Sequence, residues 1–509
     1  MGKYIKWDFT SKCNLRCIHC LAGKNYFTND VREISPDEKL QIVDNLATAD
    51  VSGITFLGGE PLVKKDIFPV SQYAASKGIA VTLVTNGTLL DETRISKIID
   101  AGIQNVTVSL DGASDTTHDQ IRGKKSFEKT VTNVGKLVSH VRSSGSGTRV
   151  KINSVVNRIN HREIDKMFEL CRQLGVDELS FLSLSEIGRA TDHRDELVLT
   201  APEMIDAAIA IGDKFNAIDK GSYPTITQQV AYPLVCDYIK QEHGLDMPKS
   251  NVSNICCFGA ISLGYVTPDG YLFPCDRIVS DNYVGRPLRG ATVQRRSLLT
   301  QPFDQIWNSD YFVKMFELVV DDDTYSHYRP CNTCRYLKTR ECNPCPLYST
   351  RSDVTIDTCL IAEKFLDAAQ CASANVGESD KSKSLFSGFN TYRPNPNILD
   401  CNLNTEYEGL IPAKVAGLRS FDKNGVTIIF NPYKAEYCRL ESVNKFLWDL
   451  VNAENTVKDI ASQMQDVISE VRKRLCLEDD GSELRDTTKW RVAGYFKDLI
   501  DAGFIKWGT

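Results

Sequence analysis

The chain has 509 residues, of which 42% are hydrophobic and 25% are charged, and its formal net charge is −6. This length predicts two to four domains, and the composition is typical of a globular protein. The acidic balance argues against a nucleic-acid-binding surface, and the lack of any apolar run of about 18 residues excludes a membrane-spanning helix. The first residues also lack the apolar run of a signal peptide, so we expect a cytoplasmic protein.

Strand and helix patterns alternate over roughly the first 190 residues. We expect strands near 5–9, 53–57, 80–84, 105–110, 149–156 and 178–182, and helices at 36–48, 67–77, 91–101, 126–141 and 164–174. Six strand–helix repeats predict parallel strands joined by right-handed crossovers. The expected fold class is therefore α/β, a partial (β/α)6 TIM-type barrel over residues 1–195, with a doubly wound sheet as the alternative.

The rest of the chain divides by composition. We expect a helical connection at 196–254, a cysteine-dense domain at 255–370, a small polar linker at 371–402 and a separate domain at 403–509. The last domain has strand patterns at 426–430 and 436–440 and three apolar helix faces, which predict a winged-helix-like α+β unit. Such units often bind DNA, but residues 401–509 hold 15 Lys and Arg against 17 Asp and Glu, a net charge of −2.

Cysteine is over-represented, with 17 residues. Disulfides are rare in a reducing cytosol, so clustered cysteines are better interpreted as metal ligands. Cys13, Cys17 and Cys20 follow the first expected strand with the spacing C-x3-C-x2-C. Three thiolates on one loop can hold three irons of a four-iron cluster and leave the fourth iron open; a zinc site is the alternative.

Glycines and polar residues stand at the carboxyl ends of the following expected strands, where α/β barrels build their active sites. They are Gly58, Gly59, Glu60, Ser109, Asp111, Asn153 and Asn157. The two glycines leave room for a ligand beside the backbone, Glu60 offers a carboxylate to an amine, and Ser109 and Asp111 suit hydroxyl groups such as those of a ribose.

These motifs, in this order, resemble the radical S-adenosylmethionine superfamily over about residues 1–195. The resemblance implies that 58–60 bind the methionine amino group of the cofactor and that Ser109 and Asp111 bind its ribose. It also implies contacts from Asn153 or Asn157, from Arg122 to the carboxylate, and from the segment 186–190, with Gly188 and Arg189, to the adenine. Position 19, often aromatic in the family, is His19, which we expect to pack beside the cluster.

The resemblance also implies the chemistry. In this family the open iron binds S-adenosylmethionine, and one electron from the cluster splits the cofactor into methionine and a 5′-deoxyadenosyl radical that takes a hydrogen atom from the substrate. The electron comes from a donor such as flavodoxin or ferredoxin. No catalytic side chain is identified from the sequence.

A second set of cysteines follows, as Cys257-x12-Gly-x4-Cys275, then Cys331-x2-Cys334-x7-Cys342-x2-Cys345, then Cys359. Cys256 or Cys236 is a possible eighth ligand, and a zinc knuckle is the alternative. The pattern resembles the SPASM extension of peptide-modifying radical enzymes, although x7 and x2 replace the x5 and x3 of that family. The resemblance implies two auxiliary four-iron clusters. One is held by Cys331, Cys334, Cys342 and Cys359, and the other by Cys257, Cys275 and Cys345, with Cys256 a candidate fourth ligand.

The segment 403–509 resembles the recognition element of ribosomally made, modified peptides, the fold of the pyrroloquinoline-quinone peptide chaperone. Such elements bind a leader peptide as an added strand. The sequence thus predicts a maturase with three four-iron clusters that cross-links or oxidises a residue of a precursor peptide, without nucleic-acid or membrane partners. The alternatives are a maturase of a folded protein, like the sulfatase maturases, and a non-enzymatic iron–sulfur regulator that binds DNA.

Overall fold

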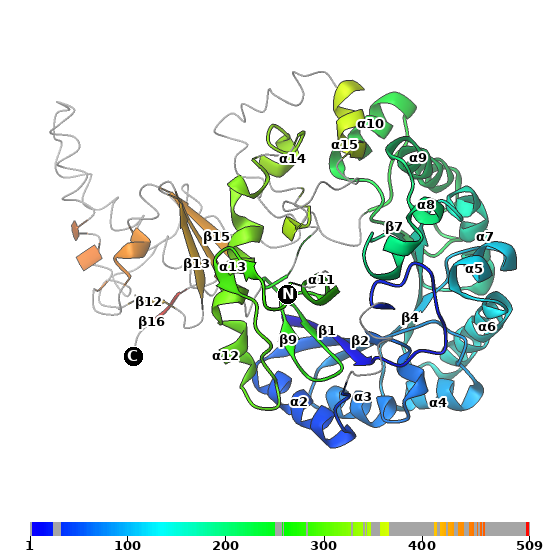
Figure 1. Cartoon of the computed structure of the whole chain (residues 1–509), viewed down its shortest axis with the longest axis horizontal. Coiled ribbons are helices and arrows are strands. Elements are labelled where there is room, and N and C mark those ends of the chain that lie inside the picture. The colour runs from blue at the N-terminus through cyan, green and yellow to red at the C-terminus, as the bar shows by residue number, and fades with distance from the viewer. Residues whose placement is uncertain are drawn as a thin grey trace, which may run out of the picture. The chain divides into compact units, whose positions relative to one another are not determined.

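A computed structural model divides the chain into two compact units, residues 2–386 and 387–509 (Figure 1). In the first unit it describes residues 3–23, 32–249, 257, 259–280, 283–326, 329–338, 342, 344–347 and 357–365. In the second unit it describes 412–414, 418–423, 426–431, 436–441, 447–451, 456, 459–460, 462–463 and 505–507. The expected linker, 371–402, lies outside these residues. None of the helices formed by the described residues is long and apolar enough to cross a bilayer.

The first unit is built on one nine-stranded sheet with the order β7-β6-β5-β4-β3-β2-β1-β8-β9. Its strands are β1 (Lys3–Thr10), β2 (Val51–Gly58), β3 (Ala80–Thr85), β4 (Asn105–Ser109), β5 (Arg149–Val156), β6 (Glu178–Ser183), β7 (Thr225–Gln228), β8 (Leu263–Val266) and β9 (Leu272–Phe273). Strands β1 to β8 pair in parallel and β9 pairs antiparallel with β8. This architecture is consistent with the expected partial barrel.

Helices cover the outer side of the curved sheet (Figure 1). They are α2 (Pro36–Thr48), α3 (Ile67–Ser76), α4 (Glu92–Asp100), α5 (Asp115–Arg122), α6 (Ser126–Ser144), α7 (Ile164–Leu174), α8 (Arg194–Leu197), α9 (Ala201–Ala217) and α10 (Pro233–His243). α7 illustrates why they form, because its buried residues Ile164, Met167, Phe168 and Cys171 recur at helical spacing on one face. The side chain of Ser35 and that of Glu38 form a capping box that starts α2.

The two faces of β1 differ in chemistry. Ile5, Trp7 and Phe9 are fully buried, and the Lys39 ammonium of α2 lies 3.7 Å from the centre of the Phe9 ring. This face therefore joins the sheet to its helices. The alternate residues form polar contacts on the other face: the Lys6 ammonium lies 3.2 Å from Asp276, and the Tyr265 hydroxyl donates to Asp8 at 2.6 Å.

Three strands beyond the expected six extend the sheet past residue 195: β7, β8 and the two-residue β9. β7 lies within the segment expected to be a helical connection and pairs with β6, and β8 lies in the cysteine-dense segment and pairs with β1. Both are only four residues long, so they offer little periodicity to detect. The cysteine-dense segment therefore contributes a strand to the same sheet that carries the cysteine loop.

The remaining helices of the first unit belong mainly to the cysteine-dense segment. They are α11 (Asp276–Ser280), α12 (Phe303–Trp307), α13 (Asp310–Val320), α14 (Arg335–Lys338) and α15 (Asp357–Phe365), with a short hairpin of β10 (Pro287–Leu288) and β11 (Ala291–Thr292). Figure 1 shows α15 beside α10, and the two helices pack against each other.

The second unit contains an antiparallel sheet of β13 (Arg419–Lys423), β14 (Val426–Asn431) and β15 (Glu436–Glu441). A second pair joins β12 (Pro412–Lys414) to β16 (Ile505–Trp507). The two strands expected at 426–430 and 436–440 are confirmed. Of the expected helices, 447–449 is helical, whereas the one expected at 492–500 lies outside the described residues. The winged-helix-like assignment stays a prediction.

Candidate functional site

The loop that carries Cys13, Cys17 and Cys20 leaves β1 and is held by the ends of other elements. The backbone N–H of Gly59 donates to the carbonyl of Thr10 and that of Glu60 to the carbonyl of Lys12, both at 2.8 Å. Farther along the loop, the Ile18 N–H donates to the backbone carbonyl of Ile121, and the Arg189 N–H donates to the backbone carbonyl of Cys20, both at 3.0 Å. Segments 58–60 and 186–190, which were expected to bind the cofactor, therefore also hold the backbone of the cysteine loop in place.

Two glycines allow these segments to approach the loop closely. A Cβ atom at Gly59 would lie 2.1 Å from the carbonyl oxygen of Lys12, and one at Gly188 would lie 2.1 Å from that of Leu21. Both distances are far below van der Waals contact. The space that we expected a ligand to use beside Gly59 is thus occupied by the protein backbone. The cofactor contacts assigned to Gly58, Gly59 and Gly188 stay predictions.

The three thiols of the loop are partly exposed, and a thiolate on Cys13 or Cys20 would add to the rise in the pKa of Cys17. Burial raises the pKa of Cys13, Cys17 and Cys20, that of Cys17 to about 12, while the Arg122 guanidinium opposes this rise at Cys17 and Cys20. Only thiolates bind metal, and a bound metal deprotonates its thiols. Three thiols on one short loop, with the buried Arg122 guanidinium 4.0 Å from the Cys17 sulfur, form a donor set that fits a cluster without a fourth protein ligand.

No three Cys, His, Asp or Glu side chains among the described residues are arranged to hold a single metal ion. A four-iron cluster places each thiolate on a different iron, so its thiolates lie farther apart than the ligands of one ion.

Glu60 is buried, and both of its carboxylate oxygens accept hydrogen bonds within the protein. Oε1 accepts from the Leu62 N–H at 3.0 Å and the Thr85 hydroxyl at 2.8 Å, and Oε2 accepts from the Asn86 N–H at 2.7 Å. Burial raises the pKa of Glu60 despite these donors. Glu60 thereby ties the end of β2 to the end of β3, and its expected contact with the cofactor amine stays a prediction.

Asp111 is the centre of a buried ionic network beneath the cysteine loop. Its carboxylate accepts from Arg122 Nε at 2.5 Å and from the Val155 N–H at 2.8 Å, and its Oδ2 lies 3.1 Å from His19 Nε2. Burial alone would raise the pKa of Asp111, but Arg122 and His19 outweigh it and the pKa is lowered. The ionised carboxylate therefore connects β4 to both α5 and the cysteine loop.

His19 is held by Asp111, whose Oδ2 lies 3.1 Å from His19 Nε2, and its expected packing beside the cluster stays a prediction. Its side chain is 8% exposed, and its Nδ1 atom is buried and has no hydrogen-bond partner among the described residues. A buried polar atom without a partner is costly. This atom therefore fits a site that is completed by a bound polar group.

The neighbouring motif, residues 118–123, has a structural explanation. The Asp111 N–H donates to His118 Nδ1 at 3.2 Å, and burial lowers the pKa of His118 to about 4, which keeps this ring neutral. Asp119 accepts from the N–H groups of Ser126 and Phe127 and so fixes the start of α6. Arg122 Nη1 lies 4.0 Å from Cys17 Sγ. The role of Arg122 at the cofactor carboxylate stays a prediction.

Ser109 and Asn153 lie directly opposite each other in the β4–β5 register. Both side chains are partly exposed, so they are placed together on one face of the sheet. Asn157 instead is fully buried, and its side chain binds the backbone of Val155 and Ile159 in its own turn. Of the two asparagines that the sequence left open, Asn153 is the better placed to meet a ligand.

Glu33 is a site residue that the sequence analysis missed. One of its oxygens accepts from the Thr10 hydroxyl at 2.6 Å and from the Ser11 N–H and hydroxyl, each at 2.9 Å. The other oxygen lies 2.5 Å from the Lys64 ammonium. Burial opposes but does not outweigh these contacts, which lower the pKa of Glu33 to about 2. Glu33 thus holds the start of the cysteine loop, and no sequence motif marks it.

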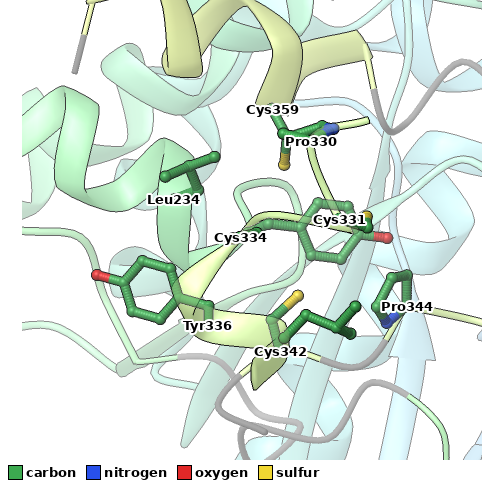
Figure 2. A pocket seen from close by; sticks show the side chains of 10 residues that line it. Leu234, Pro330, Cys331, Cys334, Tyr336, Cys342, Pro344 and Cys359 are labelled. Carbon is green, nitrogen blue, oxygen red and sulfur yellow. The ribbon is translucent and has the colours of Figure 1, made fainter. Parts of the chain in front are cut away.

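Four of the later cysteines line one cavity, together with Tyr232, Leu234, Pro330, Tyr336, Leu337 and Pro344. They are Cys331, Cys334, Cys342 and Cys359. Figure 2 shows the sulfurs of Cys359 and Cys342 pointing toward this space from opposite sides. This grouping matches the ligand set implied by the SPASM resemblance, although the spacing within the sequence differs.

Cys275 and Cys345 belong to the other implied set, and a thiolate on Cys345 would raise the pKa of Cys275. Burial raises the pKa of Cys275 to about 12. Cys257 is buried as well, and Cys256 lies outside the described residues. The Lys6–Asp276 ion pair lies next to Cys275 and joins this set to β1.

Comparison with known protein families agrees with the two cysteine sites. Residues 7–177 match the radical SAM superfamily, and residues 256–335 match the SPASM family, described as an iron-sulfur cluster-binding domain. The chain carries a radical SAM domain followed by a SPASM domain. Binding of S-adenosylmethionine and iron–sulfur clusters is supported by these families, and the radical SAM domain identifies an enzyme.

The curated relatives of the chain are named for different activities, namely heme synthesis and the modification of peptides. The AdoMet-dependent heme synthase of Methanosarcina barkeri is 29% identical over 66% of this chain and 89% of the relative. Mycofactocin maturase MftC of Mycolicibacterium smegmatis is 32% identical over 41% of this chain, which spans 52% of that relative. The PqqA peptide cyclase of Rhizobium meliloti is 26% identical over 53% of this chain and 66% of the relative.

A solved structure agrees with the radical SAM architecture. Streptococcus suis SuiB, bound to S-adenosylmethionine, superposes with a TM-score of 0.52 and 14% identity over 70% of this chain and 76% of that chain. At this identity the likeness concerns the fold alone.

Proposed function

We propose that the chain is a radical SAM maturase that removes a hydrogen atom from a residue of a ribosomally made precursor peptide and leaves it cross-linked or oxidised. The observation that carries the proposal is the loop of Cys13, Cys17 and Cys20, held against the ends of β2 and α5 inside a radical SAM domain. When bound there, a four-iron cluster and S-adenosylmethionine supply a radical that abstracts the hydrogen atom.

The protein's own residues position these groups. The three thiolates hold the cluster, and Arg122, paired with Asp111, places a buried positive charge beside Cys17. Ser109 and Asn153 present polar groups on one face of neighbouring strands, where they can bind cofactor hydroxyls. The tight packing of Gly59 and Gly188 on the loop keeps this constellation rigid, which is what precise orientation of reactants requires.

Two further clusters in the SPASM domain are proposed as the route for the electron that the substrate loses. One set lines the cavity of Figure 2, and the other includes Cys275 and Cys345 beside β1. β1, which leads into the loop of the first site, also carries Lys6, the partner of Asp276 beside Cys275.

A peptide substrate is favoured by the second unit and by the names of two relatives. Residues 387–509 form a separate unit with an antiparallel sheet. Among the described residues of this unit, β13 and β15 are the edges of the three-stranded sheet, and a leader peptide can add a strand at such an edge. Related proteins are named a maturase and a peptide cyclase.

The test is anaerobic incubation of the reconstituted full chain with S-adenosylmethionine, dithionite and short peptides encoded beside its gene. We expect one peptide to lose two hydrogens, or about 2 Da, only when all reactants are present. Deuterium from the modified residue should appear in 5′-deoxyadenosine. Release of the nucleoside without change in any such peptide would contradict the peptide assignment.

A second candidate substrate is an iron porphyrin, because two relatives that align with 66% and 67% of this chain are named heme synthases. The same assay distinguishes the candidates when iron coproporphyrin replaces the peptide. Conversion of the porphyrin, with no peptide modified, would favour this second function.

A further inference from the structure

The cysteine loop of the first site has a side that faces solvent. Its three thiols are partly exposed, and the loop residues Lys12 and Arg16 are exposed. The Arg16 guanidinium lies against the loop itself, where it donates to the carbonyl of Cys13 at 3.1 Å and to that of Leu15 at 3.2 Å. A positive charge is thereby held on the outer side of the loop that carries the thiols.

The turn between α5 and α6 brings two more exposed cations to this side. The Arg122 carbonyl oxygen lies 3.8 Å from the Cys17 sulfur. Lys124 and Lys125 follow closely in the chain, and both are exposed. Because consecutive Cα atoms are about 3.8 Å apart, the Cα of Lys124 lies within about 8 Å of that of Arg122. Asp119 faces the same turn, but its carboxylate accepts from the backbone N–H groups there, including that of Lys125.

The exposed charges on this side of the loop are of one sign. Neither the loop, residues 11–20, nor the stretch 120–127 contains an acidic residue. The acids on the other segments that hold the loop are either buried or ion-paired; they are Glu33, Glu60 and Glu186. The chain as a whole carries a net charge of −6, so this positive surface is a local exception. We call its four exposed cations the basic rim: Lys12, Arg16, Lys124 and Lys125.

We propose that the basic rim is the docking surface for an acidic one-electron carrier protein, a flavodoxin or a ferredoxin, that reduces the cluster of the first site. The carrier loses one electron and the cluster gains it, and no covalent bond forms or breaks in this step. The inference rests on the part of the proposed function that places a cluster on Cys13, Cys17 and Cys20.

Charge complementarity favours this partner. The net negative charge of the chain repels an acidic carrier, so productive encounters need a local surface of opposite sign. Charges at exposed positions act over about 10 Å at 0.1 M salt, which is the reach of one docking surface. Complementary charges raise the association rate and fix the orientation of the partner. Since the rim includes residues of the cysteine loop itself, a carrier docked on it lies beside the cluster that it reduces.

The test compares two reductants on the full chain reconstituted with its clusters, with S-adenosylmethionine and without peptide. Dithionite is small and needs no docking surface, whereas an acidic flavodoxin, reduced beforehand and freed of excess reductant, does. We expect Lys124→Glu/Lys125→Glu to slow flavodoxin-driven release of 5′-deoxyadenosine at least about tenfold at low salt. It should weaken binding of oxidised flavodoxin, measured by calorimetry, by a similar factor. Dithionite-driven release should stay at the parent's rate.

Two further variants separate docking from other effects of the substitutions. Lys124→Arg/Lys125→Arg keeps both charges and should keep the parent's rate with flavodoxin. Lys97→Glu/Lys136→Glu makes the same change in net charge at exposed positions of α4 and α6 outside the rim, and should bind flavodoxin as the parent does.

Two results would overturn the docking surface: flavodoxin-driven release from Lys124→Glu/Lys125→Glu at the parent's rate, or an equal decrease in the Lys97→Glu/Lys136→Glu control. A parent that releases no 5′-deoxyadenosine even with dithionite would instead overturn the cluster of the proposed function, on which the docking surface depends.

Discussion

The charged residues around Asp111, beside the cysteine loop, are buried and form ion pairs with one another. Asp111 is fully buried and binds Arg122, His19 and a backbone N–H at once. A buried charge that loses its partner costs far more than an exposed one. The network therefore explains why a carboxylate, an arginine and a histidine are found together beside the cysteine loop.

Asp111→Asn should lower the free energy of unfolding of the metal-free chain by about 3 kcal/mol, because Arg122 would keep its charge without a buried partner. Asp115→Asn is the matched control: the same chemical change at an exposed position of α5 should cost less than about 0.5 kcal/mol. Urea unfolding followed by circular dichroism measures both. Equal effects would show that the network does not stabilise the fold.

Glu33 makes the stability of the cysteine loop depend on pH. Its pKa is lowered from 4.5 to about 2, so its stabilisation is complete above pH 4.5 and is lost as the pH falls through about 2. Glu33→Gln should therefore destabilise the metal-free chain by about 1 to 3 kcal/mol at pH 7 and by almost nothing near pH 2. Melting temperatures across this range test it, with the exposed Glu92→Gln as control. A pH-independent difference would contradict the assigned role.

At the scale of elements, the segments that follow the strands pack against the cysteine loop and determine its path. The segment after β2 lies so close to the cysteine loop that only glycine fits at position 59. Gly59→Ala should displace the loop and reduce iron at the first site, measured by iron analysis of a chain that lacks the other two sets of cysteines. Gly135→Ala, in the open middle of α6, should leave iron binding unchanged. Full iron binding in Gly59→Ala would refute the close packing.

The sequence predicts the regular elements well where their pattern is long. The bounds of α2 and α7 are as expected, because each has an amphipathic face and a clear start or end. β7 was missed because four residues carry no reliable period. Glu33 and the Asp111–Arg122 pair could not be derived from spacing, because their partners meet only through the tertiary fold.

At the scale of the whole molecule, the second unit is proposed to capture the peptide while the first performs the chemistry. A chain that ends at Phe386, the boundary of the first unit, should release 5′-deoxyadenosine at the full rate when no peptide is present. It should bind and modify the precursor peptide at least about tenfold more weakly, which corresponds to about 1.4 kcal/mol. Peptide modification that is unaffected by the truncation would exclude leader binding by the second unit.

The central claim is that Cys13, Cys17 and Cys20 hold a cluster with an open iron for S-adenosylmethionine. Release of 5′-deoxyadenosine under anaerobic reduction tests it most directly. The full chain should release the nucleoside, and Cys13→Ala, Cys17→Ala and Cys20→Ala should each abolish release, while Cys171→Ala should not. Release that persists in the three loop variants would contradict the account.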